Sequence, residues 1–375
     1  MEKVNPHKNS VSNDNIESDS EKKTSKKKSK AKNYLLSGIF LLVLMTITFY
    51  VIFKDNSIVD IWAVLKTVKL SYALYGVIAM IGFIIFQGIV IGLSAECLQT
   101  KLTTWEMLQY SFVSFFYSGI TPSAVGGQPM QFYHMCRDRL SPSKATLVLF
   151  ITNMAYQMVI VILGLLMFFT KLNYIISVNR SIIILFFLGL SVNVFILLIL
   201  FGVMFSESLL KRILIGSVSF LCRIKIIKNS EKALKSIENY LDEFRSGVEL
   251  IKNNEKRFVL ILLSTSAHFL LYHMIPFFVY SAFGFSATTC FNMVAISSVL
   301  YVAINLFPLP GSVGAAESGF VILFGPFFAK TILPAMLLSR FINFYTMILL
   351  SGAFSAYAQL RKPYNLSSKE HSIVQ

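Results

Sequence analysis

Two ionisable residues stand inside long apolar stretches near the C-terminal end of the chain. Glu317 lies in "PLPGSVGAAESGF" and Arg340 lies in "AMLLSRFINFYTMILLSG". A charge at the centre of a bilayer is costly unless it is paired, so such residues are usually paired and are candidates for function. We expect Glu317 and Arg340 to form an ion pair. The sequence leaves open whether the pair fixes the structure, binds a substrate or does both.

A second group of polar residues interrupts an apolar stretch at 119–131, "GITPSAVGGQPMQ". Gly126 and Gly127 are expected to present backbone N–H groups that an anion can reach. Gln128 and Gln131 would add uncharged hydrogen-bonding groups beside them. These four residues are therefore predicted to bind substrate, and packing inside a hairpin is the alternative.

Basic residues follow this stretch directly. Arg137 and Arg139 lie in "HMCRDRLSPSK", and Lys144 ends it. Cations at a membrane interface can hold a lipid phosphate, and arginine offers a two-pronged donor for it. The alternative is that these residues only mark the cytoplasmic side of the membrane.

Other chemistry finds little support in the sequence. Cys97, Cys136, Cys222 and Cys290 lack the close spacing of a zinc site or a disulfide framework. The histidines show no metal-ligand arrangement. We expect no metal and no cofactor. His268 and His273 are expected to form separate hydrogen bonds and not a joint proton relay, because residues five apart share a helix face poorly.

The net charge of +15 does not indicate a nucleic-acid-binding protein. The basic residues lie mainly in the N-terminal tail and in 206–257, where acidic residues are interleaved as on a solvated amphipathic helix. Retention of positive charge on the cytoplasmic side explains the excess. No nucleic-acid partner is expected for this chain alone.

The elements that must position these residues are membrane helices. Hydrophobic residues make up 55% of the chain and charged residues 14%, a balance that one soluble core cannot bury. The sequence therefore predicts an all-α integral membrane protein. Runs of about 20 apolar residues, enough to cross the hydrocarbon, indicate about six full transmembrane helices. They lie near 34–53, 72–94, 145–169, 181–205, 258–283 and 334–357.

Two further apolar segments, 107–133 and 291–327, are interrupted by Pro and Gly. Because Lys and Arg collect in cytoplasmic loops, the Lys-rich N-terminal tail, the loop 134–144 and the loop 206–257 are placed inside. The segment 107–133 must then enter and leave from the cytoplasmic side, and 291–327 from the other side. We expect two re-entrant hairpins of opposite orientation, with both termini cytoplasmic and the protein in the cell membrane.

The two interrupted segments also align with each other. When Pro122 is placed on Pro310, Gly126 falls on Gly314. With the opposite orientations, this predicts an inverted repeat, the architecture of many secondary transporters, whose substrate site lies between broken helices. The architecture alone is not evidence of transport. In chain order, the expected regions are a disordered basic tail at 1–33, a first membrane half at 34–205, a cytoplasmic amphipathic loop at 206–257, a second membrane half at 258–360 and a cytoplasmic tail at 361–375.

These motifs resemble a known family. "TPSAVGGQP" with its basic loop, then "PLPGSVGAAE" and an arginine in the last span, is similar to the membrane domain of the lysylphosphatidylglycerol synthase and flippase-like family, the integral part of the multiple peptide resistance factor. The resemblance covers roughly residues 34–360. It implies a domain that moves aminoacylated phosphatidylglycerol or another polar lipid between leaflets. It also places Gly126, Gly127, Glu317 and Arg340 at the family's motif positions.

The chain departs from that family pattern in two ways. Gln128 and Gln131 stand where many relatives carry an acidic residue and an arginine, which leaves the lysyl group of the substrate open. The soluble synthase domain that transfers lysine from charged tRNA is expected to be missing, because only a short tail follows the last predicted span.

Three functions therefore remain open. The first is a flippase for a membrane phospholipid, anionic or aminoacylated, such as lysyl-phosphatidylglycerol. The second is a phosphatidylglycerol lysyltransferase that transfers lysine from lysyl-tRNA to phosphatidylglycerol. The third is a scaffold for a separate synthase polypeptide. Transport ranks first, since no acid/base cluster is recognisable outside the membrane segments.

Overall fold

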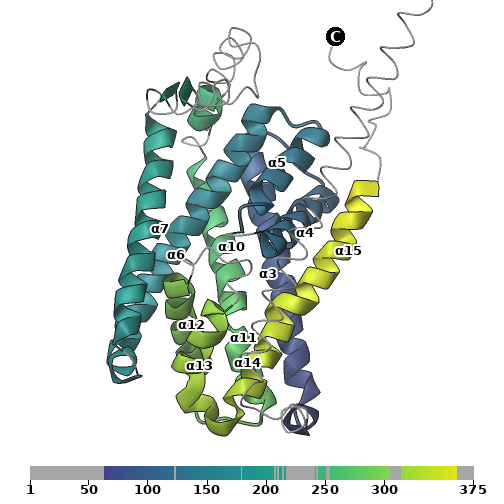
Figure 1. Ribbon diagram of the computed structural model, residues 1–375. Helices are drawn as coiled ribbons and strands as arrows, with labels where there is room; N and C mark the ends of the chain where they lie inside the picture. The colour runs from purple at the N-terminus through teal and green to yellow at the C-terminus, as the bar shows by residue number, and fades with distance from the viewer. Residues whose placement is uncertain are drawn as a thin grey trace, which may run out of the picture. The chain divides into compact units, whose positions relative to one another are not determined.

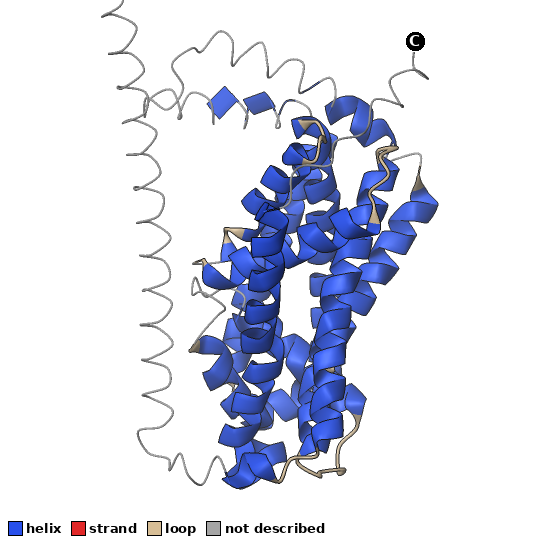
Figure 2. Ribbon diagram, turned by 90° about the vertical axis from the view of Figure 1, so that its right-hand side faces the viewer, coloured by secondary structure: helices blue, strands red, loops and turns tan. Residues whose placement is uncertain are grey.

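The chain separates into two compact units, Met1–Lys54 and Asp55–Gln375. The computed structural model describes residues of the second unit only, namely 63–121, 124–178, 180–206, 208, 211–212, 215–216, 241, 244–250, 254–304 and 314–360. Most of these residues lie in helices, the rest lie in turns and loops, and none of them lies in a strand (Figure 2). The predicted span 34–53, both tails and most of the loop 206–257 fall outside the described residues.

Five helical stretches are long and apolar enough to cross a membrane: Leu70–Cys97, Pro142–Val178, Ser181–Met204, Glu255–Ala282 and Ala315–Leu360. They cover the five predicted spans that fall within the described residues, except for the last residue of 181–205 and of 258–283. The first three are α3 (Leu70–Cys97), α6 (Pro142–Val178) and α7 (Ser181–Phe205). The prediction of an all-α integral membrane protein is confirmed.

The fourth and fifth stretches are not continuous helices. The fourth consists of α10 (Glu255–His273) and α11 (Ile275–Ala282), which meet just before Pro276. Proline has no N–H to donate and its ring crowds the preceding turn, which explains the break. The fifth contains α13 (Ala315–Phe328), the short 3-10 turn η4 (Ala329–Thr331), α14 (Ile332–Arg340), the π-turn η5 (Phe341–Tyr345) and α15 (Thr346–Leu360). At its main break Ala329 has a φ of 46°.

A first helical hairpin is formed by α4 (Thr104–Ile120) and α5 (Gly127–Arg137). A capping box starts α4: the Thr103 hydroxyl accepts from the Glu106 N–H, and the Glu106 carboxylate accepts from the Thr103 N–H at 2.7 Å. With 17 and 11 residues, the helices extend roughly 26 and 17 Å at 1.5 Å per residue. Neither reaches the roughly 30 Å of a hydrocarbon core.

A second hairpin is formed by α12 (Cys290–Ile304) and α13, which pack against each other. Their 15 and 14 residues extend only roughly 21–23 Å. Figure 1 places the α4–α5 hairpin toward one end of the described unit and the α12–α13 hairpin toward the other. Residues 305–313, between α12 and α13, and residues 122–123, between α4 and α5, lie outside the described residues.

The C-terminal span connects the two hairpins. Toward the far end of α15, Trp105 and Phe112 of α4 both stack on Phe354, with ring centroids 4.8 and 4.7 Å apart. Toward its start, Gly119 of α4 lies so close to Phe344 and Ile348 that a Cβ there would contact both. The tip of the first hairpin therefore lies against the π-turn that directly follows Arg340.

Candidate functional site

The centre of the candidate site is the ion pair between the second hairpin and the span that follows it. Arg340 Nε lies 2.7 Å from Glu317 Oε1, and the two side chains are 10% and 7% exposed. The predicted pair is confirmed. The pairing matters energetically because a buried charge without a partner would carry its full desolvation cost.

Local sequence explains how Glu317 is held. Gly314 precedes α13 with a φ of 89°, a conformation that glycine adopts without the clash a Cβ would cause. Its N–H donates to Glu317 Oε2 at 2.6 Å, so the carboxylate caps the helix with one oxygen and meets Arg340 with the other. A negative charge in the first turn is also stabilised by the helix dipole.

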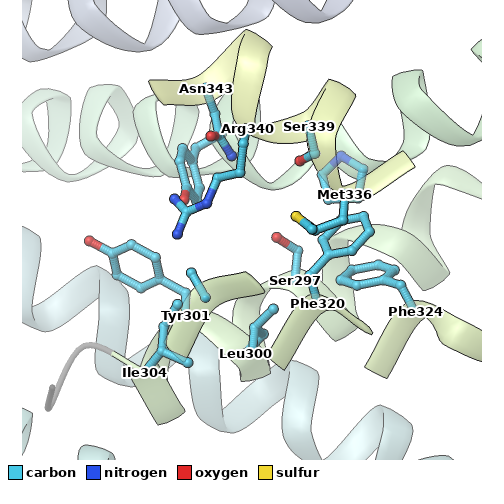
Figure 3. A pocket seen from close by; sticks show the side chains of 13 residues that line it. Ser297, Leu300, Tyr301, Ile304, Phe320, Phe324, Met336, Ser339, Arg340 and Asn343 are labelled. Atoms are coloured by element: carbon cyan, nitrogen blue, oxygen red, sulfur yellow. The ribbon is translucent and has the colours of Figure 1, made fainter. Parts of the chain in front are cut away.

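Beside the pair lies a small cavity of about 40 Å³, here called the ion-pair cavity. Figure 3 shows Ser339, Arg340 and Asn343 on one wall and Ser297, Leu300, Tyr301 and Ile304 on the opposite wall. The first wall is formed by α14 and η5 and the second by α12. The Oδ1 atom of Asn343 is buried and has no hydrogen-bond partner among the described residues. The cavity thus contains polar groups that a ligand or water can satisfy.

One of the two histidines of α10 contacts a residue of the ion-pair cavity. His273 Nδ1 lies 3.0 Å from the hydroxyl of Ser297, which lines the cavity. His268 Nδ1 instead lies 2.7 Å from the Phe83 carbonyl oxygen of α3. The prediction of separate hydrogen bonds for the two histidines is confirmed.

An apolar groove adjoins the cavity. It has a volume of about 390 Å³ and is lined by α7, the end of α12 and the start of α13. Leu300 and Ile304 line both the groove and the ion-pair cavity. Gly319 leaves room for this arrangement, because a Cβ there would collide with Leu300 Cδ1. The ion-pair cavity and the apolar groove therefore adjoin at Leu300 and Ile304.

The glycine pair of the first hairpin serves close packing. A Cβ on Gly127 would clash with Ser118 Oγ and come within 2.8 Å of the Ser114 carbonyl oxygen, so only glycine lets α5 start this close to α4. The N–H of Gly126 donates to Thr121 Oγ1 at 2.9 Å. The expectation that this N–H is accessible to an anion is wrong, because the hairpin's own hydroxyl already occupies it.

The two glutamines also have partners inside the protein. Gln128 Nε2 donates to Asn153 Oδ1 of α6 at 2.7 Å. Gln131 is 3% exposed and donates to the Tyr110 carbonyl oxygen at 3.2 Å. Both contacts tie α5 to its neighbours, as in the packing alternative left open by the sequence.

The two arginines after the first hairpin differ in their surroundings. Arg137 donates to the Ala358 carbonyl oxygen of α15 at 3.1 Å and lies 3.3 Å from the Asp138 carboxylate. Arg139 is exposed, has a φ of 78° and lines a separate pocket with Lys144. Of the predicted site residues, the structure thus brings Glu317 and Arg340 together, and places the other six in or beside the first hairpin.

Several residues of the ion-pair cavity were not among the predicted site residues. Ser297, Ser339 and Asn343 are polar residues within apolar runs, and that signal was present in "AISSVLY" and "SRFINF". The π-turn after Arg340 had no comparable signal, although such turns occur frequently at functional sites. Among the described residues, no cluster of His, Cys, Asp or Glu is suited to a metal.

A comparison with known protein families shows which family this chain belongs to. The family described as the lysylphosphatidylglycerol synthase TM region matches residues 35–351. The chain belongs to this family. It is also similar to a UPF0104 membrane protein of Archaeoglobus fulgidus, with 22% identity over 317 residues, which are 84% of this chain and 94% of that protein. The residues matched to the lysylphosphatidylglycerol synthase TM region include both hairpins, the ion pair and the first part of α15.

Proposed function

We propose that this membrane protein moves a polar phospholipid between the leaflets of the cell membrane, with the headgroup passing beside Glu317 and Arg340. The observation that supports this most strongly is the position of a buried ion pair next to both a small cavity with polar side chains in its walls and an apolar groove. A phospholipid needs both environments at once, because its headgroup is charged and its acyl chains are not.

The chemistry of the pair favours a headgroup that carries a phosphate and an amine. Arginine recognises phosphate oxygens through its planar donors, and a carboxylate accepts from an ammonium group. A headgroup with both charges can replace each partner of the Glu317–Arg340 pair, so that no buried charge is left uncompensated during passage. An aminoacylated phosphatidylglycerol, lysyl-phosphatidylglycerol included, fits this requirement.

The surroundings of Arg340 support movement of the hairpins during transport. The ion-pair cavity of about 40 Å³ has room for a few waters and not for a headgroup. Opening requires the second hairpin to move against α14, and the residues between them include Ala329, with a φ of 46°. In transporters with broken helices, such repeats rock around a fixed site. The expected orientation, with both termini cytoplasmic, belongs to this proposal.

The experiment is a lipid-movement assay in proteoliposomes. Purified full-length protein is reconstituted with fluorescent phosphatidylglycerol or fluorescent lysyl-phosphatidylglycerol, and dithionite added outside bleaches the outer leaflet. Protein-dependent bleaching beyond the outer leaflet is expected for wild type, and its loss is expected for Glu317→Gln. Equal bleaching with and without protein would overturn the proposal.

The same purified protein can be tested for the two other functions, lysyl transfer and scaffolding. Formation of lysyl-phosphatidylglycerol from lysyl-tRNA and phosphatidylglycerol would identify the chain as a lysyltransferase. Stimulation of a separately added synthase, without lipid movement, would identify it as a scaffold.

A further inference from the structure

A second polar site lies at the end of the unit where the first hairpin begins and ends. The turn between α3 and α4 meets the turn between α5 and α6 there, and together they line an open pocket of about 500 Å³. Residues 100–103 and 138–141 line it, with Glu106 and Lys144. We call it the basic pocket. Its volume is in the range of small-molecule sites, which is roughly 300–1,000 Å³.

Three cations converge on the basic pocket: Lys101, Arg139 and Lys144. Lys144 Nζ makes one long contact of 3.4 Å with Thr100 Oγ1. The side chains of Lys101 and Arg139 make no ion pair or hydrogen bond with any described residue. Lys101 and Arg139 come from two turns that are distant in sequence and Lys144 comes from the start of α6, and the fold brings all three to one pocket.

The two carboxylates of the pocket are already used by its walls. Glu106 accepts from the N–H and hydroxyl of Thr103 at 2.7 and 2.8 Å, which closes the capping box of α4. Asp138 accepts from Gln109 Nε2 at 2.9 Å and from the Tyr110 hydroxyl at 3.3 Å, and it pairs with Arg137. Three cations thus stand against two carboxylates in the lining, and one of these, Asp138, is paired with Arg137 outside it, so the pocket carries a net positive charge.

Backbone features add to that positive charge. Both α4 and α6 start at the pocket, and the N-terminal end of a helix carries a partial positive charge. The Arg139 backbone has a φ of 78°, which costs free energy for any residue other than glycine. This conformation ends α5, because the Leu140 N–H donates to the Met135 carbonyl oxygen at 3.0 Å, and the residue that adopts it places its side chain at the pocket.

We propose that the basic pocket binds a phosphate group, with Lys101, Arg139 and Lys144 as its ligands. The phosphate can be that of an anionic phospholipid headgroup or that of a soluble phosphate ester. The site is separate from the ion-pair cavity, toward the other end of the unit (Figure 1), and it does not rest on the proposed transport. Arg137, which the sequence also suggested for a phosphate, is not part of it.

The test compares two triple variants of the full-length protein. Lys101→Gln, Arg139→Gln and Lys144→Gln remove the pocket cations, whereas Lys211→Gln, Arg212→Gln and Lys256→Gln remove the same charge from exposed positions outside the pocket. Binding is measured by thermal stabilisation and by native mass spectrometry. The lipid probe is phosphatidylglycerol against phosphatidylcholine in nanodiscs, and the soluble probes are inorganic phosphate and glycerol 3-phosphate.

The proposal predicts that at least one phosphate probe binds wild type and the control triple alike, and binds the pocket triple about tenfold or more weakly, since each charge-assisted hydrogen bond contributes that much. Binding of phosphatidylglycerol alone identifies a lipid site, and binding of the soluble probes identifies a phosphate-ester site. Equal loss in both triples would overturn the proposal, because the effect would then be one of surface charge. Binding of no probe to wild type would also overturn it. If the triple does not fold, Lys101→Gln alone is used, with Lys256→Gln as its control. No outcome depends on lipid movement.

Discussion

The ion pair between Glu317 and Arg340 allows a quantitative test by a double-mutant cycle. Glu317→Gln keeps an oxygen that can accept from the Gly314 N–H, so the change removes mainly the charge. With atoms 2.7 Å apart and side chains 10% and 7% exposed, each single variant leaves one buried charge without its partner. Such a loss costs about 3–5 kcal/mol of unfolding free energy.

The double variant with Glu317→Gln and Arg340→Gln should cost less than the sum of the singles, because neither charge of this pair is left buried without its partner. We expect a coupling energy of about 1–3 kcal/mol. The assay is the free energy of unfolding in mixed micelles, followed by circular dichroism during titration with SDS.

The matched control is the exposed pair of Arg257 and Glu96. Their closest charged atoms are 3.8 Å apart, and the side chains are 42% and 45% exposed. Solvent screening reduces such a pair to about 0.2–1 kcal/mol, so its cycle should be nearly additive. Additivity within about 0.5 kcal/mol in the Glu317–Arg340 cycle would refute the reasoning.

Three further predictions follow from packing, backbone strain and topology. Gly127→Ala should destabilise the protein by about 1–3 kcal/mol through overpacking against α4. Gly325→Ala is the control: its added Cβ meets nothing within 4 Å, and it should stabilise α13 by about 0.5–1 kcal/mol. Thermal melts in detergent compare the two variants, and equal effects would contradict the packing argument. Arg139→Gly should raise the free energy of unfolding by about 1–2 kcal/mol, because glycine adopts a φ of 78° without strain. The same variant should bind phosphate more weakly in the basic pocket. A lower melting temperature than wild type would show that the Arg139 side chain contributes more to folding than the backbone strain costs. Single cysteines in 134–144 should be protected from an impermeant thiol reagent added outside cells, while those in 170–180 should react; the reverse pattern would invert the proposed topology.

The sequence was informative where one physical constraint dominated. Helices had to be about as long as the membrane is thick, so the spans that fall on described residues were found from apolar runs alone. Likewise, Glu317 and Arg340 had to find partners because each stood in an apolar segment, and they pair with each other.

The sequence was less informative where tertiary contacts decide. The Gly126 N–H is satisfied by Thr121 and the Gln131 amide by the Tyr110 carbonyl oxygen, and both contacts depend on how α5 packs on α4. Lys101 was not predicted for any site, because it reaches the basic pocket only after two separate turns come together. The presence of polar residues in an interrupted helix therefore does not tell whether they bind a substrate or pack against neighbouring helices.

The central claim is that the Glu317–Arg340 pair serves lipid movement as well as stability, and the folded double variant tests it most directly. Glu317→Gln with Arg340→Gln is reconstituted after its melting temperature and circular dichroism have been checked, and movement of fluorescent phosphatidylglycerol and lysyl-phosphatidylglycerol is measured against wild type. We expect a folded protein that no longer moves either lipid. Without Glu317 and Arg340, no charged side chain of the pair compensates the headgroup for the water it loses on entering the membrane. Movement at the wild-type rate by the folded double variant would contradict the account and leave the pair a purely structural role.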